Sequence, residues 1–85
     1  MYNEKDLIYS PLQQSITQDG ETIEVGIYRL PNAGWTLEIT DQYGNSTIYE
    51  DTFETDQEAL DVFLEDLKIE GIEEFVVRPP ANTLH

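Results

Sequence analysis

Apolar and polar residues alternate with a period of two in several short segments of the chain, which is the pattern of half-buried β-strands. The alternation is clearest in residues 21–30 and 35–41. On the shared apolar side of these two segments lie Ile23, Val25, Ile27, Trp35, Leu37 and Ile39. The pattern predicts two strands that pack one face against a core and leave the other face polar.

Two further segments, residues 12–18 and 46–53, are predicted as strands. Asp19-Gly20 follows the first of them and favours a two-residue hairpin, because both positions tolerate a positive φ. Turn-forming residues at 31–34 and 42–45 separate the remaining strands. The sequence therefore indicates an antiparallel meander of four strands joined by short hairpin loops.

The facing of residues 46–53 stays open, because Ile48 lies out of phase with Tyr49 and Phe53. One interpretation is a strand with apolar residues on both faces. The other is a bulge near Glu50-Asp51 that resets the phase. Both interpretations place the segment beside residues 35–41 in the sheet.

Residues 55–71 carry the start, face and stop signals of one α-helix. Thr55 is a favourable N-cap, and Glu58 three positions later completes a capping box. Gly71 supplies the stop, and a Schellman motif there would bring Ile72 against Leu67. The apolar stripe at helical spacing consists of Leu60, Phe63, Leu64 and Leu67, widened by Ala59 and Val62.

Two segments near the ends of the chain are ambiguous in sequence. Residues 7–9 fit a short strand or a helical turn, and residues 75–77 fit a short fifth strand or an extended cover over the helix end. Pro79-Pro80 ends regular structure, because proline has no N–H donor. We expect one α+β domain over residues 1–78 and a flexible tail over residues 79–85. The expected architecture is a two-layer ββββα fold, with the helix packed on one face of the sheet.

Charge narrows the choice of partners. Eighteen acidic and four basic residues give the 85-residue chain a formal net charge of −14. Such a chain repels nucleic acid and anionic membranes and attracts basic proteins. It has no cysteine, no apolar run near the ~20 residues of a membrane span, and no signal-peptide pattern at its N-terminus. We therefore expect a cytoplasmic protein without nucleic-acid or membrane partners.

Residues that could carry catalysis are few. His85 is the only histidine, and it lies beyond two prolines, where the chain does not fix the geometry that a catalytic base needs. The glycines are scattered and form no phosphate-binding loop. In the loop that begins at Asp41, an EF-hand pattern fails at Tyr43, Ser46 and Thr52. The sequence thus predicts no enzyme, no cofactor and no metal site.

The candidate interaction surface is the outer side of the predicted helix and the residues that follow it. Like charges four positions apart on a helix cost a few tenths of a kcal/mol per pair. One interpretation of this tolerated cost is a functional negative face, and the other, which is the commoner origin of such a charge pattern, is a solvated face that keeps the protein soluble. The members of this surface, called the acidic face below, are Asp61, Glu65, Asp66, Glu70, Glu73 and Glu74.

Two other surfaces are weaker candidates. Glu24, Tyr28 and Glu38 fall on the outer face of adjacent strands, where paired carboxylates could bind a ligand or be merely solvated. The strand at residues 12–18 has no charge, and as a sheet edge it could pair with a second copy into a homodimer.

These features predict a small acidic protein with a non-enzymatic interaction or regulatory role, which binds a basic protein partner or itself. One alternative is an acidic nucleic-acid mimic that sequesters a nucleic-acid-binding protein, with its carboxylates along one continuous surface. The other is a small ligand-binding domain or enzyme that uses the outer-face carboxylates, which requires a concave pocket.

Overall fold

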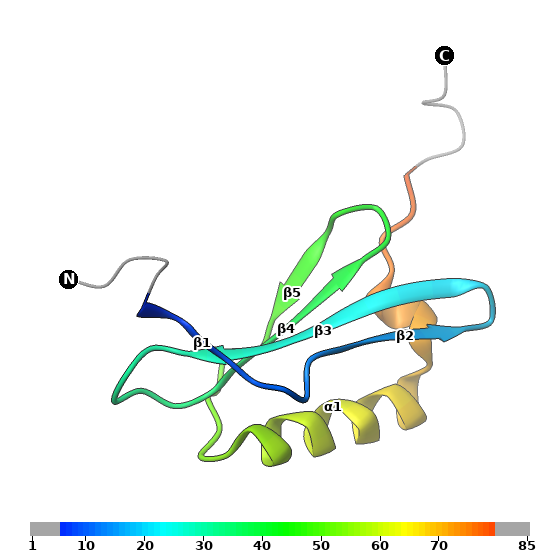
Figure 1. Cartoon of the computed structure of the whole chain (residues 1–85). Helices are drawn as coiled ribbons and strands as arrows, with labels where there is room; N and C mark the ends of the chain where they lie inside the picture. The colour runs from blue at the N-terminus through cyan, green and yellow to red at the C-terminus, as the bar shows by residue number, and fades with distance from the viewer. Residues whose placement is uncertain (1–5, 80–85) are drawn as a thin grey trace.

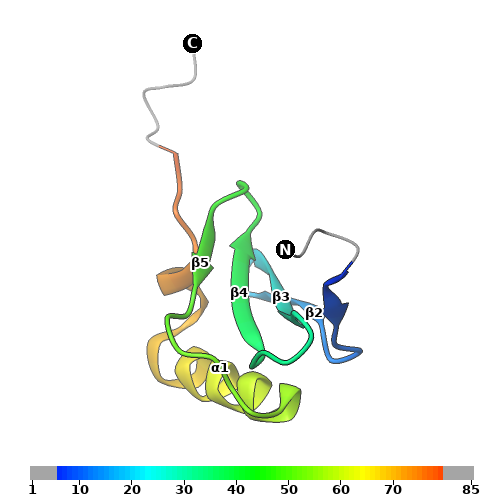
Figure 2. The same ribbon diagram turned by 90° about the vertical axis from the view of Figure 1, so that its left-hand side faces the viewer.

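An antiparallel sheet and one α-helix form the two layers of the molecule (Figure 1). The computed structural model describes residues 6–79. In chain order the elements are β1 (Ile8–Tyr9), β2 (Gln14–Gln18), β3 (Glu21–Arg29), β4 (Thr36–Asp41), β5 (Ser46–Ile48), α1 (Asp56–Glu70) and the 3₁₀ helix η2 (Ile72–Phe75). Figure 2 shows the sheet from the side, with α1 against one face. The predicted α+β class with a C-terminal helix is confirmed.

β3 is the central strand, in the order β1-β3-β4-β5, and β2 also pairs with β3. β1 and β2 therefore follow one side of β3 in succession. The break between them is bridged at Ile27, whose carbonyl accepts from the Ser10 N–H and whose N–H donates to the side-chain oxygen of Gln13, each at 2.9 Å. The segment at residues 7–9, which the sequence left ambiguous, thus contributes a short strand rather than a helical turn.

The predicted hairpin between β2 and β3 is confirmed. Asp19 has a φ of 52° and Gly20 a φ of 80°. Both values lie in the left-handed region that a two-residue type I′ turn requires. The turn sets Gln18 opposite Glu21, and this register places Ile16 and Ile23 on the same face of the sheet.

The core lies between the sheet and α1. Its buried residues are Ile23, Val25, Ile27, Leu37, Ile39, Ala59, Leu60, Phe63, Leu67 and Ile72. Trp35, expected on this apolar side, packs against the core but is only partly buried. The assignment of Leu64 to the buried stripe is wrong, because Leu64 is 40% exposed. It follows Phe63 directly and so lies about 100° further around the helix.

The segment at residues 46–53 carries apolar residues on both faces of the sheet, as in the first of the two interpretations. β5 ends at Ile48, which points to the outer face and is 56% exposed. The Tyr49 N–H donates to the Leu37 carbonyl, and the chain then leaves the sheet. It returns at Phe53, which exchanges two backbone hydrogen bonds with Trp35. Tyr49 and Phe53 both pack on the core side, so the irregular residues between them do not reset the phase of the segment.

α1 begins as predicted and ends with a simpler cap. The Thr55 hydroxyl accepts from the Glu58 N–H at 3.0 Å, and the Glu58 carboxylate accepts from the Glu54 N–H at 3.1 Å. At Gly71, with a φ of 87°, a single bond runs from its N–H to the Leu67 carbonyl. This replaces the paired bonds of the Schellman motif that the sequence suggested. Within residues 6–79, no helix has the length and hydropathy needed to cross a membrane.

Of the two alternatives for residues 75–77, the short strand is absent from the described part of the chain. Residues 72–75 form η2, and residues 76–79 run in an extended conformation outside any strand. The N–H of Val77 donates to the Asp41 carboxylate at 2.8 Å, and its carbonyl accepts from the Asn45 side chain at 3.1 Å. Because these bonds go to side chains, the segment covers the end of the sheet without joining it. The predicted tail, apart from Pro79, lies outside the described residues.

Candidate functional site

The acidic face lies on α1, which the sequence predicts, and on η2, which it does not indicate. Five of its six members are exposed, and Asp66 is half-buried. The Asp66 carboxylate accepts from the Tyr49 hydroxyl at 2.7 Å and so ties α1 to the chain that follows β5. Burial, followed by the hydrogen bond and charge of Asp66 and the charge of Glu70, raises the pKa of Tyr49 above its ordinary range. Tyr49 therefore stays a neutral hydrogen-bond donor at the edge of the acidic face.

The cations of residues 6–79 do little to neutralise this surface. Arg29 stacks over Trp35, with its guanidinium carbon 5.0 Å from the ring centroid. Arg78 forms an ion pair with Glu21, which is the one ion pair made between two residues of this range. Lys68 alone lies on α1 among the carboxylates. Most of the negative charge of the helix therefore faces outward without a basic neighbour bound to it.

Three members of the acidic face meet at a groove beside β5. We call it the acidic groove. Its volume is about 330 Å³, and its lining residues are Thr47, Tyr49, Asp66, Glu70, Glu74 and Phe75. A second depression, of about 450 Å³, lies along α1 and includes Asp61, Glu65 and Asp66. Glu73 is exposed and lines neither of them.

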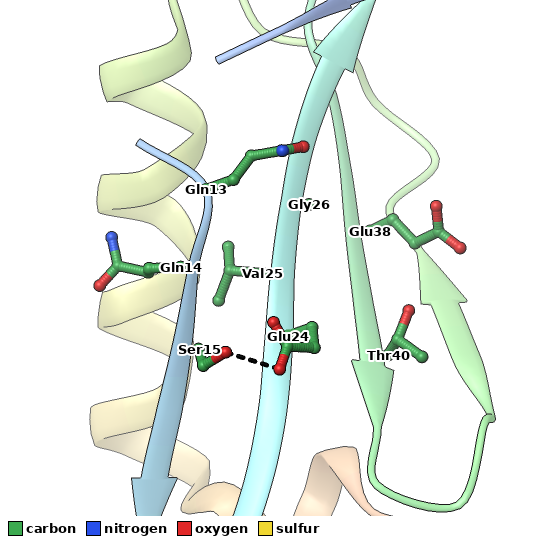
Figure 3. A pocket seen from close by; sticks show the side chains of 8 residues that line it. All are labelled: Gln13, Gln14, Ser15, Glu24, Val25, Gly26, Glu38 and Thr40. Carbon is green, nitrogen blue, oxygen red and sulfur yellow. Dashed lines mark hydrogen bonds between the residues drawn. The ribbon is translucent and has the colours of Figure 1, made fainter. Parts of the chain in front are cut away.

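The alternative site on the outer sheet face is a polar hollow of about 370 Å³ (Figure 3). Glu24 accepts a hydrogen bond from the Ser15 hydroxyl at 2.6 Å, and Glu38 accepts one from the Tyr28 hydroxyl at 2.8 Å. Figure 3 shows the Glu24 carboxylate directed toward β2 and the Glu38 carboxylate directed away from it. The two carboxylates are thus held apart by separate partners and do not form a pair.

Tyr28 belongs to this outer face but does not line the hollow. Burial, then the hydrogen bond to Glu38 and its charge, raises the pKa of Tyr28 to about 12. Its ring lies 6.2 Å from the Tyr9 ring, at a tilted angle. Tyr28 is therefore a neutral hydrogen-bond donor that positions Glu38. Its ring contact with Tyr9 also joins β1 to β3.

Two carboxylates that the sequence did not single out, Glu21 and Asp41, are buried at one end of the sheet. The Asp41 carboxylate accepts from the backbone N–H groups of Tyr43, Asn45 and Val77 at 2.8 to 2.9 Å. Burial acts to raise its pKa, but the hydrogen bonds from Val77, Asn45 and Tyr43 outweigh burial and lower it to about 2. The loop compared with an EF-hand is thus organised by its own amide groups.

A signal for these two residues is present in the alternation itself. Glu21 is in phase with Ile23 and Val25, and Asp41 is in phase with Leu37 and Ile39. Period-two facing therefore directs both carboxylates toward the helix side of the sheet. A carboxylate buried on that side needs hydrogen-bond donors or a cation beside it. An inward-facing acid in the sequence therefore indicates a structural role.

Within residues 6–79, no three or more histidine and carboxylate side chains gather to hold a metal ion. Comparison of the chain with protein-family models, with curated proteins and with solved structures finds no match.

Proposed function

We propose that this chain is a small cytoplasmic interaction protein without enzymatic activity, which binds a basic protein partner through its acidic face. The observation that carries the proposal is the concentration of exposed carboxylates on α1 and η2, in a chain whose net charge is −14. Repulsion among such carboxylates costs stability. A cationic partner would relieve that repulsion on binding, which gives the complex a driving force and a rapid, steered association.

The outer sheet face supports a ligand-binding or catalytic role less well. Its carboxylates are each engaged by a neighbour and point in different directions. Catalysis by a pair of carboxylates needs both groups within reach of the reacting part of one substrate. The geometry therefore favours the acidic face over the outer sheet as the working surface.

The test is an affinity pull-down from the source lysate with three forms of the protein. The first is wild type, the second carries Glu65→Gln, Glu70→Gln and Glu74→Gln, and the third carries substitutions on the sheet side of the molecule. Each variant loses three negative charges relative to wild type, but at different positions. The comparison therefore separates the effect of position from the effect of total charge. The substitutions of the third form are Asp19→Asn, Glu24→Gln and Glu38→Gln.

We expect a basic protein that wild type retains at low salt and releases at moderate salt, because salt screens exposed charges. The helix variant should lose this protein and the sheet variant should keep it. Equal loss from both variants would contradict a localised site and indicate general charge attraction. Retention of a second copy of the chain alone would point to the β2 edge and self-association.

A further inference from the structure

β5 is an open edge of the sheet. It pairs with β4 on one side, and no described strand lies on its other side. The Asp41 N–H donates to the Asn45 carbonyl, and the Tyr49 N–H donates to the Leu37 carbonyl. Because hydrogen-bonded and non-bonded positions alternate along an antiparallel pair, the N–H and C=O groups of Ser46 and Ile48 face away from β4. They are free to pair with an added strand.

The acidic groove runs beside this open edge. Thr47 and Tyr49 point to the helix side of the sheet and form one wall, while Asp66, Glu70 and Glu74 come from α1 and η2. Phe75 supplies an apolar surface and is held by an edge-on ring contact with the buried Phe63, at 5.1 Å. Every second side chain of a strand added to β5 would point toward this groove.

Charge decides what kind of strand fits. The groove presents three carboxylates next to two aromatic rings. A lysine or arginine side chain matches this combination, because its aliphatic stem packs on apolar surface while its charged end stays polar. A second copy of this chain does not match, because each copy carries a net charge of −14.

We infer that β5 and the acidic groove together bind an extended basic segment of the partner, which adds to the sheet as a new strand next to β5. Backbone hydrogen bonds to Ser46 and Ile48 hold the segment, and alternate lysine or arginine side chains enter the groove. In strand addition of this kind, the backbone hydrogen bonds provide affinity and the pockets for alternate side chains provide specificity. The inference rests on the proposed function and specifies the form that the basic partner takes at the acidic face.

The test uses three synthetic eight-residue peptides of alternating lysine and threonine, with capped ends. The first is unmodified, the second is N-methylated on every threonine, and the third is N-methylated on every lysine. The two methylated peptides have equal charge and mass. In a strand, successive N–H groups point to opposite sides, so each methylation pattern blocks a different edge of the peptide.

Binding is measured by titration of ¹⁵N-labelled protein, followed by NMR. We expect the unmodified peptide to shift the amide signals of Ser46 and Ile48, and one methylated peptide to bind at least tenfold more weakly than the other. Threonine methylation is the damaging pattern in antiparallel addition and lysine methylation in parallel addition. The double substitution Glu70→Gln and Glu74→Gln should weaken the unmodified peptide, whereas Glu24→Gln with Glu38→Gln should not.

Equal binding of all three peptides, with shifts confined to α1 and η2, would overturn strand addition and leave the acidic face itself as the binding surface. If none of the three peptides binds, strand addition is also overturned. The pull-down would then still decide the proposed function. Shifts at Ser15 and Thr17 in place of Ser46 and Ile48 would place the peptide on the β2 edge and likewise contradict the inference.

Discussion

On α1 and η2 the carboxylates are largely exposed and greatly outnumber the cations, whereas at the end of the sheet Glu21 and Asp41 are only 3% and 4% exposed. Each of these two buried carboxylates has a donor group bound to it. Backbone N–H groups converge on Asp41, and Arg78 pairs with Glu21. On the helix, Asp66 has the Tyr49 hydroxyl as a donor, but no comparable cage forms around its neighbours.

This difference distinguishes acidic residues that stabilise the fold from acidic residues that are exposed to solvent. A buried carboxylate is tolerated only where hydrogen bonds or a cation replace the water it has lost. Glu21 and Asp41 both hold the segment at residues 76–78, which closes the end of the core. Glu21 is the less well compensated of the two, because its Oε1 atom has no hydrogen-bond partner among the described residues. The exposed members of the acidic face hold no comparable segment among the described residues, which is why we propose this face as the surface for a partner.

Removal of the Asp41 carboxylate is the change that should affect the fold most. Asp41→Ala deletes the acceptor for three backbone N–H groups and frees both the loop after β4 and Val77. Buried donors that lose a charged acceptor are costly, so we expect the melting temperature to fall by roughly 10 °C. Thermal unfolding followed by circular dichroism measures this shift.

Asp41→Asn is the matched control, because it keeps the size of the side chain and one acceptor oxygen. We expect a smaller fall in melting temperature for Asp41→Asn than for Asp41→Ala. An unchanged melting temperature in Asp41→Ala would mean that residues 76–78 are held by Asn45 and Arg78 alone. The Asp41 carboxylate would then contribute as little to the stability of the fold as we expect of the exposed acids on α1.

Much of the fold follows from local patterns in the sequence. The period-two alternation locates β3 and β4, Asp19-Gly20 locates the hairpin, and Thr55 with Glu58 locates the start of α1. Each of these signals acts between residues that are close in the chain. Local hydrogen bonds and facing decide them, so a single sequence is enough to predict them.

The sites depend on contacts that local patterns do not contain. The acidic groove exists because η2 brings Glu74 and Phe75 next to β5, and the sequence indicates neither η2 nor its position. The pairing of Arg78 with Glu21 joins residues that are distant in the chain. The alternation marks Glu21 and Asp41 as inward-facing, but only the three-dimensional arrangement shows the donors that make this stable.

The buried Asp41 carboxylate should make the stability of the fold depend on pH. Hydrogen bonding lowers the pKa of Asp41 from its ordinary value of 3.8 to about 2 in the folded state. A depressed pKa in the folded state means that the stabilisation is fully present above about pH 4 and is lost as the pH falls toward 2. The difference in unfolding free energy between wild type and Asp41→Asn should therefore shrink over this range.

Urea denaturation at a series of pH values between 2 and 6 measures that difference. Titration of the exposed acids contributes to both proteins and cancels in the comparison. A difference that stays constant down to pH 2 would contradict the assignment of the charged Asp41 carboxylate as the stabilising species.

The smallest expected effect has the opposite sign. Glu70 lies at the C-terminal end of α1, four residues after Asp66, and is exposed. Its charge is repelled by Asp66 and by the negative end of the helix dipole. Glu70→Gln should therefore stabilise the protein by a few tenths of a kcal/mol, measured by urea denaturation at low salt, with the gain reduced at high salt. The same substitution should weaken the binding of the lysine–threonine peptide. Stabilisation together with weaker binding is the behaviour of an acid kept for a partner, whereas a loss of stability would place Glu70 with Asp41 among the structural acids.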